Sequence, residues 1–129
     1  MSDLDEYQVW TRSMAQYPSA GTGRSPAIIY TVIGLVDESG EVAGKLKKAL
    51  RGDGPPPPSS QDDVSSGTVG AVRLVGEPAL LSELGDVLWY LARLSDETGF
   101  TLSEVAARNR EKLESRKARG VIKGSGDAR

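Results

Sequence analysis

Apolar residues recur at intervals of three and four along most of the chain, and this spacing predicts helices. The first helix is expected over 3–16. The second is expected over about 27–51, where Ser25 is a suitable N-terminal cap and Pro26 a suitable first-turn residue. The third is expected over 77–98. The pattern therefore favours an all-α fold.

A fourth helix is expected directly after a glycine that stops the third. Gly99 is a natural stop signal at a helix C-terminus. Thr101 or Ser103 then begins the new helix, which runs to about 118, and Thr101 forms a capping-box pattern with Glu104. The predicted architecture is a four-helix bundle.

The second and third predicted helices each place apolar residues in one broad sector of the helical wheel. In the second helix this sector holds Val32, Leu35, Val42, Ala43, Leu46 and Leu50. In the third it holds Leu80, Leu84, Val87, Leu88 and Leu91. We expect the two helices to pack against each other through these sectors.

The segment 52–76, between the second and third helices, differs sharply in composition. It contains four consecutive prolines, which cannot continue a helix, followed by many Ser, Asp and Gly residues. These features predict a flexible insertion, with a short strand or hairpin possible over 68–75. A tolerated surface insertion is the simplest interpretation, and a lid or an oligomer contact is the alternative. The glycine-rich tail over 119–129 is expected to be irregular.

Composition narrows the range of chemistry open to this protein. The 129 residues suit a single domain over 1–129, and the small size favours an oligomer. A net charge of −2 argues against a general nucleic-acid-binding or membrane-binding surface. No apolar run is long enough to span a membrane, and the acidic N-terminus resembles no signal peptide, so a cytoplasmic location is expected. The absence of Cys and His means that any metal ligands must be oxygen atoms.

Two acidic pairs border the apolar sectors. Glu38 and Glu41 are three residues apart in the second helix, and Glu83 and Asp86 have the same spacing in the third. Residues three apart share a helix face, so antiparallel packing would bring the four carboxylates together. Because like charges repel, such a group is best explained by a divalent cation such as Mg²⁺, Mn²⁺ or Ca²⁺, which prefers carboxylate oxygens.

Basic residues and one asparagine accompany the acidic pairs. Asn109, Lys112 and Arg116 share one face of the fourth helix and would suit a polyphosphate substrate if they point toward the metal. Lys45 and Lys48 extend the acidic stripe of the second helix. These two lysines either contact phosphate or pair with a nearby Glu.

Other interpretations of the same residues remain open. Glu-x-x-Glu pairs on helices are usually solvated surface. A ferritin-like di-iron site uses Glu-x-x-His pairs, which a chain without His cannot supply. The chain could also be a non-enzymatic helical oligomer whose carboxylates bind a structural divalent cation. A nucleic-acid-binding bundle using "KLKKALRG" (45–52) is a third, weaker alternative.

The combination of motifs resembles a known family. "GLVDESGEVAGKLKK" (34–48), "ELGDVLWYLARL" (83–94) and the sequence from 109 to 129 are similar to MazG-like nucleotide pyrophosphohydrolases, of the all-α NTP pyrophosphatase superfamily. "YQVWTRSMAQYP" (7–18) is also similar. The resemblance covers nearly the whole chain except 52–76.

The resemblance implies a function and a set of site residues. It implies metal-dependent hydrolysis of a nucleoside triphosphate to a monophosphate and pyrophosphate, with two or more Mg²⁺ or Mn²⁺ ions per site. It further implies that Glu38 orients or deprotonates the attacking water. Asp37 matches an additional acidic position of the family. The residues that match the family's metal and phosphate positions are Glu38, Glu41, Glu83, Asp86, Asn109, Lys112 and Arg116, and Lys45 is a further candidate for phosphate.

The resemblance also bears on assembly and biological role. Members of the family form homodimers, or homotetramers built from two dimers. A phage-encoded MazZ-like branch removes dGTP and sometimes dATP, whereas other members remove damaged nucleotides. If this chain belongs to the phage branch, it acts on a purine dNTP such as dGTP in the host cytoplasm. One departure is the 41-residue gap over 42–82, which is longer than usual and is explained by the proline-rich insertion.

Overall fold

The computed structural model describes residues 2–53 and 76–121, and all regular structure within these ranges is helical. The elements, in chain order, are α1 (Asp3–Thr11), a 3₁₀ turn η1 (Arg12–Met14), α2 (Ser25–Lys48), a π turn η2 (Ala49–Asp53), α4 (Glu77–Glu97) and α5 (Leu102–Ala118). The all-α prediction is confirmed. Most of the predicted insertion, including the possible strand over 68–75, and most of the predicted irregular tail lie outside the described residues.

The helix ends agree with the predicted ones to within a few residues, with one wrong cap. At α5 the backbone N–H of Thr101 donates to the Glu104 carboxylate at 2.7 Å, and the Glu104 N–H donates to the Thr101 hydroxyl at 3.1 Å, so the capping box is confirmed. At α2, however, Ser25 is already helical and Arg24 is the cap residue. The helix starts there because the Arg24 carbonyl accepts the first hydrogen bonds of the turn that contains Pro26.

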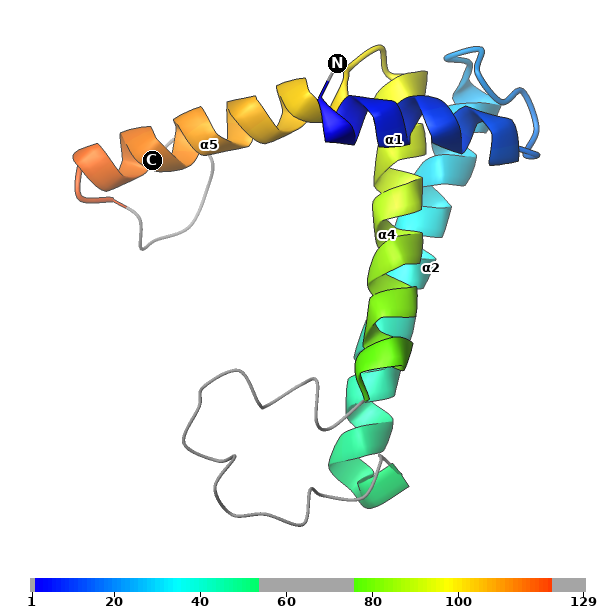
Figure 1. Cartoon of the computed structure of the whole chain (residues 1–129), viewed down its shortest axis with the longest axis vertical. Coiled ribbons are helices and arrows are strands. Elements are labelled where there is room, and N and C mark those ends of the chain that lie inside the picture. The colour runs from blue at the N-terminus through cyan, green and yellow to red at the C-terminus, as the bar shows by residue number, and fades with distance from the viewer. Residues whose placement is uncertain (1, 54–75, 122–129) are drawn as a thin grey trace.

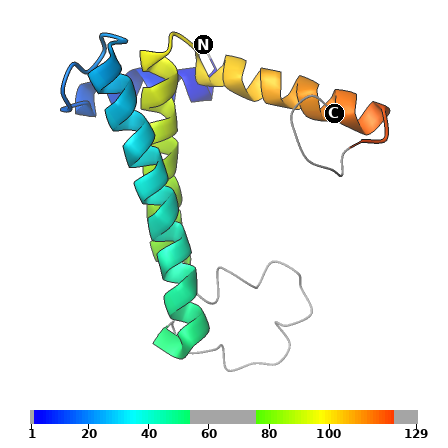
Figure 2. The same cartoon turned by 180° about the vertical axis from the view of Figure 1, so that it is seen from behind.

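The helices α2 and α4 lie side by side and antiparallel along most of their lengths (Figure 1). The helix α1 packs across the end where α2 begins and α4 finishes, and α5 projects away from the α2–α4 pair (Figures 1 and 2). One chain therefore has the four predicted helices, but α5 does not lie beside α2 and α4. The site must be sought along the contact between α2 and α4, which we call the seam.

Apolar burial within the single chain is limited. Within the described ranges few apolar residues are fully buried, and most of these are alanines. They are Tyr17, Ala27, Ala49, Ala92 and Leu102. The faces of α2 and α4 opposite the seam carry large exposed aliphatic residues. We call these the outer stripes, and they comprise Ile29, Ile33 and Val36 on α2 and Leu81, Leu84 and Leu88 on α4.

The outer stripes correct the predicted packing sectors. Leu84 and Leu88 were expected in the contact between the helices, but 47% and 37% of their surfaces are exposed. Val32 and Leu50 are exposed as well, at 42% and 77%. Each helix carries apolar residues on more than one face, and a helical wheel does not reveal which face a partner covers.

The end of α4 is held by a buried polar network. The Glu97 carboxylate accepts hydrogen bonds from the Tyr17 hydroxyl at 2.6 Å and from the backbone N–H groups of Gly21 and Gly23 at 2.6 and 2.8 Å. Arg93, with 1% of its side chain exposed, donates to the Tyr17 hydroxyl at 3.2 Å and lies 3.7 Å from Glu97. The network ties the connection between α1 and α2 to α4.

The network also sets the protonation of its carboxylate. Burial by itself would raise the pKa of Glu97, but the hydrogen bonds from Tyr17, Gly21 and Gly23 and the charge of Arg93 lower it below its usual range. The stabilisation that follows from this lowered pKa is present above the ordinary pKa of Glu. It is lost as the pH falls through the lowered value in the folded protein.

The direction of α5 is fixed by its first turn. The Gln8 side chain donates to the Phe100 carbonyl at 2.8 Å and accepts from the Leu102 N–H at 2.7 Å. The Asp5 carboxylate accepts from the backbone N–H and the hydroxyl of Ser103, at 3.0 and 2.8 Å. These bonds fasten the start of α5 to α1, and the rest of the helix extends outward.

We predict that Glu97→Ala lowers the free energy of unfolding by about 3 to 5 kcal/mol, because it removes one of the two carboxylates beside the buried Arg93 and the acceptor of three hydrogen bonds from Tyr17, Gly21 and Gly23. Urea unfolding at neutral pH and fixed protein concentration measures the change. Glu114→Ala removes an exposed pair with Arg110 and should cost no more than about 0.5 kcal/mol. The difference in the free energy of unfolding between the wild type and Glu97→Gln should narrow as the pH is lowered through the depressed pKa of Glu97. Equal losses in both alanine variants would contradict the assignment.

Candidate functional site

Three carboxylates converge in the seam. Glu38 comes from α2, and Glu83 and Asp86 come from successive turns of α4. One carboxylate oxygen of each lies within 4.8 Å of those of the other two. The predicted meeting of acidic residues across an antiparallel contact is therefore observed for these three.

The charges of the cluster act on Glu38 most clearly. Burial raises the pKa of Glu38, and the negative charges of Asp86, Asp37, Glu83 and Glu41 raise it further. The side chain is half-buried, so water screens these charges only in part. Three convergent carboxylates fit a hard divalent cation, which would neutralise their mutual repulsion.

Glu41 stands apart from the three convergent carboxylates. Its side chain is exposed, and it does not belong to the group whose oxygens lie within 4.8 Å of one another. Its charge still contributes to the raised pKa of Glu38. The expected group of four is thus a group of three with Glu41 at its edge.

Lys45 forms an ion pair with one carboxylate of the cluster. Its Nζ lies 2.9 Å from a carboxylate oxygen of Glu83, across the seam. The hydrogen bond and charge of Glu83 raise the pKa of Lys45. The lysine therefore pairs with the opposite helix rather than with Glu41 on its own helix.

The predicted phosphate residues of the fourth helix lie elsewhere. Asn109, Lys112 and Arg116 belong to α5, which extends away from the seam (Figure 1). Asn109 and Lys112 are exposed, whereas Arg116 is buried with 6% exposure. A single chain does not bring these residues to the carboxylates, because the bonds of Gln8 and Asp5 direct α5 outward.

An aromatic wall adjoins the carboxylates. Its Tyr90 lies four residues after Asp86 on the same helix face, a spacing that favours a role at the site, whereas the pattern did not place the other rings there. A Cβ atom on Gly34 would overlap the ring of Tyr90, so only glycine allows this ring to lie against the α2 backbone. Tyr90 lies 6.3 Å from Tyr30 between ring centroids, and Tyr30 stacks on Tyr17 at 5.1 Å. Trp89 meets Tyr90 edge to face at 4.9 Å.

The signal that could have revealed the wall was Gly34. A glycine inside a helix costs on the order of 1 kcal/mol relative to alanine, so its presence calls for a packing reason. The Tyr90 ring is that reason.

Burial, a hydrogen bond with Tyr30 and the nearby charges of Glu38 and Asp37 raise the pKa of Tyr90 to about 12, so its hydroxyl stays neutral at physiological pH.

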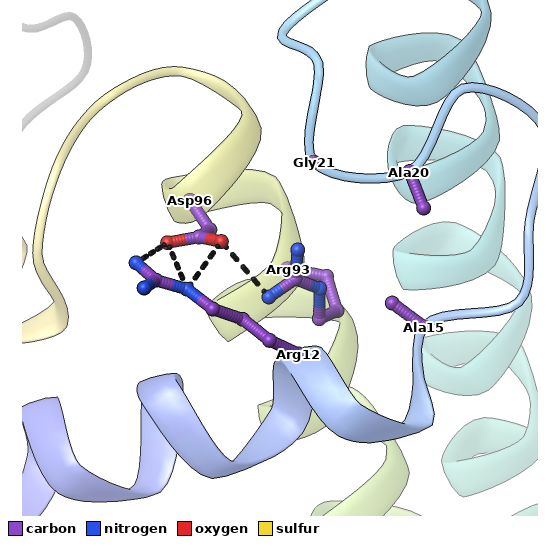
Figure 3. Close-up of a pocket in the computed structure, with 6 residues that line it drawn as sticks. All are labelled: Arg12, Ala15, Ala20, Gly21, Arg93 and Asp96. Atoms are coloured by element: carbon purple, nitrogen blue, oxygen red, sulfur yellow. Dashed lines mark hydrogen bonds and ion pairs between the residues drawn. The ribbon is translucent and has the colours of Figure 1, made fainter.

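A separate pocket of about 410 Å³ lies between η1, the connection to α2 and the end of α4 (Figure 3). Its charged lining is internally paired, since Asp96 binds Arg12 at 2.6 Å and Arg93 at 3.0 Å. Ala15, Ala20 and Gly21 complete the lining shown in Figure 3. These pairings give the pocket a structural explanation, and the seam remains the candidate site.

Among the described residues, none of the helices is both long enough and apolar enough to cross a membrane.

Comparison with known proteins gives a consistent result. Residues 30–121 match the model of the MazG nucleotide pyrophosphohydrolase domain. The chain is 43% identical over 128 residues to the Gene 37 protein of Mycobacterium phage L5, covering 98% of each chain. No solved structure is significantly similar. The matched region contains every carboxylate of the seam, and the chain belongs to the MazG nucleotide pyrophosphohydrolase family.

Proposed function

We propose that this protein is a metal-dependent hydrolase that converts a nucleoside or deoxynucleoside triphosphate to the monophosphate and pyrophosphate. The observation that carries the proposal is the convergence of Glu38, Glu83 and Asp86 in the α2–α4 seam. Family membership supports the reaction class, since the family is one of nucleotide pyrophosphohydrolases.

The metal of this proposal is Mg²⁺ or Mn²⁺, with two or more ions per site. Glu38, Glu83 and Asp86 would hold them, with Glu41 at the edge of the group. The donor set fits, because all of these ligands are carboxylate oxygens. When bound, such ions lower the pKa of a coordinated water and offset the charge that develops on phosphate.

In the proposed reaction, Glu38 acts as the base. A water oxygen attacks the α-phosphorus, the bond from that phosphorus to the bridging oxygen of the β-phosphate breaks, and pyrophosphate leaves. Glu38 takes the proton of the water.

We further propose a purine deoxynucleotide such as dGTP as the substrate, and the host cytoplasm as the place of action. The support is the similarity to a mycobacteriophage protein together with the resemblance to phage MazZ-like enzymes. Pyrophosphate release from each of the canonical dNTPs and NTPs tests the choice of base.

The proposed active form is a homodimer or homotetramer. The outer stripes support this, because they leave large aliphatic residues such as Ile33 and Val36 exposed, at 63% and 68%. The projecting α5 supports it as well, because Asn109 and Lys112 could reach the seam of a neighbouring subunit. Arg116 is buried within its own chain and is not part of this proposal.

Glu38→Ala and Asp86→Ala should each lower kcat/KM by about a thousandfold or more, equivalent to about 4 kcal/mol of lost transition-state stabilisation. The assay is pyrophosphate release with Mg²⁺ or Mn²⁺ present, and circular dichroism checks that the helices persist. Glu114→Ala, an exposed acidic change on α5, is the matched control and should retain full activity. Unchanged turnover in either seam variant would falsify the site assignment.

Glu38→Gln should raise the melting temperature of the metal-free protein at neutral pH by a few degrees, because it removes a charge from a repelling cluster. The raised pKa sets the sign: the repulsion is present above that pKa and is relieved as the pH falls through it. The higher melting temperature of the variant should therefore approach that of the wild type on acidification.

Mn²⁺ at one hundred times its Kd should stabilise the wild type by about 2.7 kcal/mol, and Glu38→Gln by less. Equal stabilisation by Mn²⁺ would exclude Glu38 as a ligand.

Val36→Glu should reduce the oligomer to a monomer, because a charge in an outer stripe cannot be buried unpaired between subunits. Size-exclusion chromatography with light scattering measures the mass. Gln16→Glu adds the same charge at an exposed position away from the stripes and should leave the mass unchanged. A wild-type protein that is monomeric at micromolar concentration would contradict the proposal.

A further inference from the structure

The two ends of the seam differ in their chemistry. Beyond the carboxylates on one side lies Lys45, whose Nζ contacts Glu83 at 2.9 Å. Lys48 and Arg51 follow it at the same end of α2. On the other side lie the aromatic rings of Tyr90 and Tyr30. The seam is therefore cationic at one end and aromatic at the other.

The order of these groups follows from helix geometry. Lys45 comes seven residues after Glu38, which is about 10 Å along α2. Tyr90 comes four residues after Asp86, which is about 6 Å along α4. Because α2 and α4 run in opposite directions, the lysine and the tyrosine lie on opposite sides of the carboxylates.

The aromatic end has a defined shape. Gly34 lets the Tyr90 ring lie directly against the α2 backbone, one turn from Glu38. Tyr30 is held by stacking on the buried Tyr17, and Glu97 in turn holds the Tyr17 hydroxyl. With 43% of its surface exposed, Tyr30 still offers a ring to a ligand. Fixed, partly exposed rings are suited to stacking against a base.

The cationic end can exchange its partner. In the ion pair between Lys45 and Glu83, 36% of the lysine side chain is exposed. The Glu83 side chain is only 13% exposed, so the pair opens to solvent at its lysine end, where the ammonium group is within reach of a phosphate. A phosphate also carries more charge than one carboxylate and offers more acceptor oxygens.

We propose that the seam binds its nucleotide in a single direction, with the pyrophosphate portion at Lys45 and the nucleoside at Tyr30 and Tyr90. The proposal rests on the proposed function. The β- and γ-phosphates carry most of the substrate's negative charge, so they favour the end that supplies a cation. The opposite direction would place these phosphates against neutral rings and leave the base beside an ammonium group.

The test measures how strongly each product inhibits the metal-activated enzyme. Lys45→Ala should raise the inhibition constant of pyrophosphate about tenfold, the loss expected for one charge-assisted contact, and leave that of the nucleoside monophosphate within about twofold. Tyr30→Ala should raise the inhibition constant of the monophosphate about tenfold, the loss expected for one stacking partner, and leave that of pyrophosphate within about twofold. Lys47→Ala, an exposed lysine on the same helix, is the control and should change neither constant.

Tyr30→Phe separates stacking from a loss of structure. It keeps the ring, so the inhibition constant of the monophosphate should return to within about twofold of the wild-type value. Failure of this rescue would show that Tyr30 does not act through its ring. Circular dichroism and melting temperature accompany each variant.

The outcomes separate the direction of binding from the proposed reaction. A reversed pattern, or equal changes in both constants for Lys45→Ala, would overturn the direction. If the wild type releases no pyrophosphate from any nucleoside triphosphate, the proposed function fails. Calorimetric titration of the Mn²⁺-loaded protein with pyrophosphate and with a monophosphate then still tests the direction. Absence of binding of both products would overturn it.

Discussion

The close antiparallel contact between α2 and α4 is the constraint on which the rest of this structure depends. At its centre Gly34 lacks the Cβ that would overlap the Tyr90 ring. Because the two helices meet there, Glu38 on one and Asp86 on the other, each one turn away from that contact, are brought together. A larger residue at position 34 would force the tyrosine aside and separate the acidic residues. A glycine that weakens the helix locally thus sets the geometry of the site.

Stabilising and destabilising interactions are separated along the same pair of helices. The seam holds three convergent carboxylates, and burial together with the neighbouring negative charges raises the pKa of Glu38. At the end near α1, the buried Glu97 is instead fully satisfied by hydrogen bonds, and its pKa is lowered. Two acidic groups of one protein therefore have opposite environments. The satisfied one fits a structural role and the repelling one fits cation binding.

Much of the fold and part of the site could be predicted from the sequence. The helix ends near Gly99 and Thr101 follow from local stop and cap signals, and these depend only on neighbouring residues. The pairing of acidic residues across two helices follows from their spacing. The direction of α5 could not be predicted, because it depends on hydrogen bonds that the backbone N–H groups of Leu102 and Ser103 donate to Gln8 and Asp5, more than 90 residues distant along the chain.

The sequence by itself determined which residues are helical and which acidic residues share a face, since helix periodicity is a local property. It also carried the family resemblance that the comparison with known proteins confirmed. Only the tertiary structure decided which face of each helix is covered, and so placed Glu41 at the edge of the group and Leu84 in an exposed stripe. Periodicity fixes the angles between residues on one helix, whereas the rotation of that helix against its neighbour depends on packing such as that of Tyr90 on Gly34.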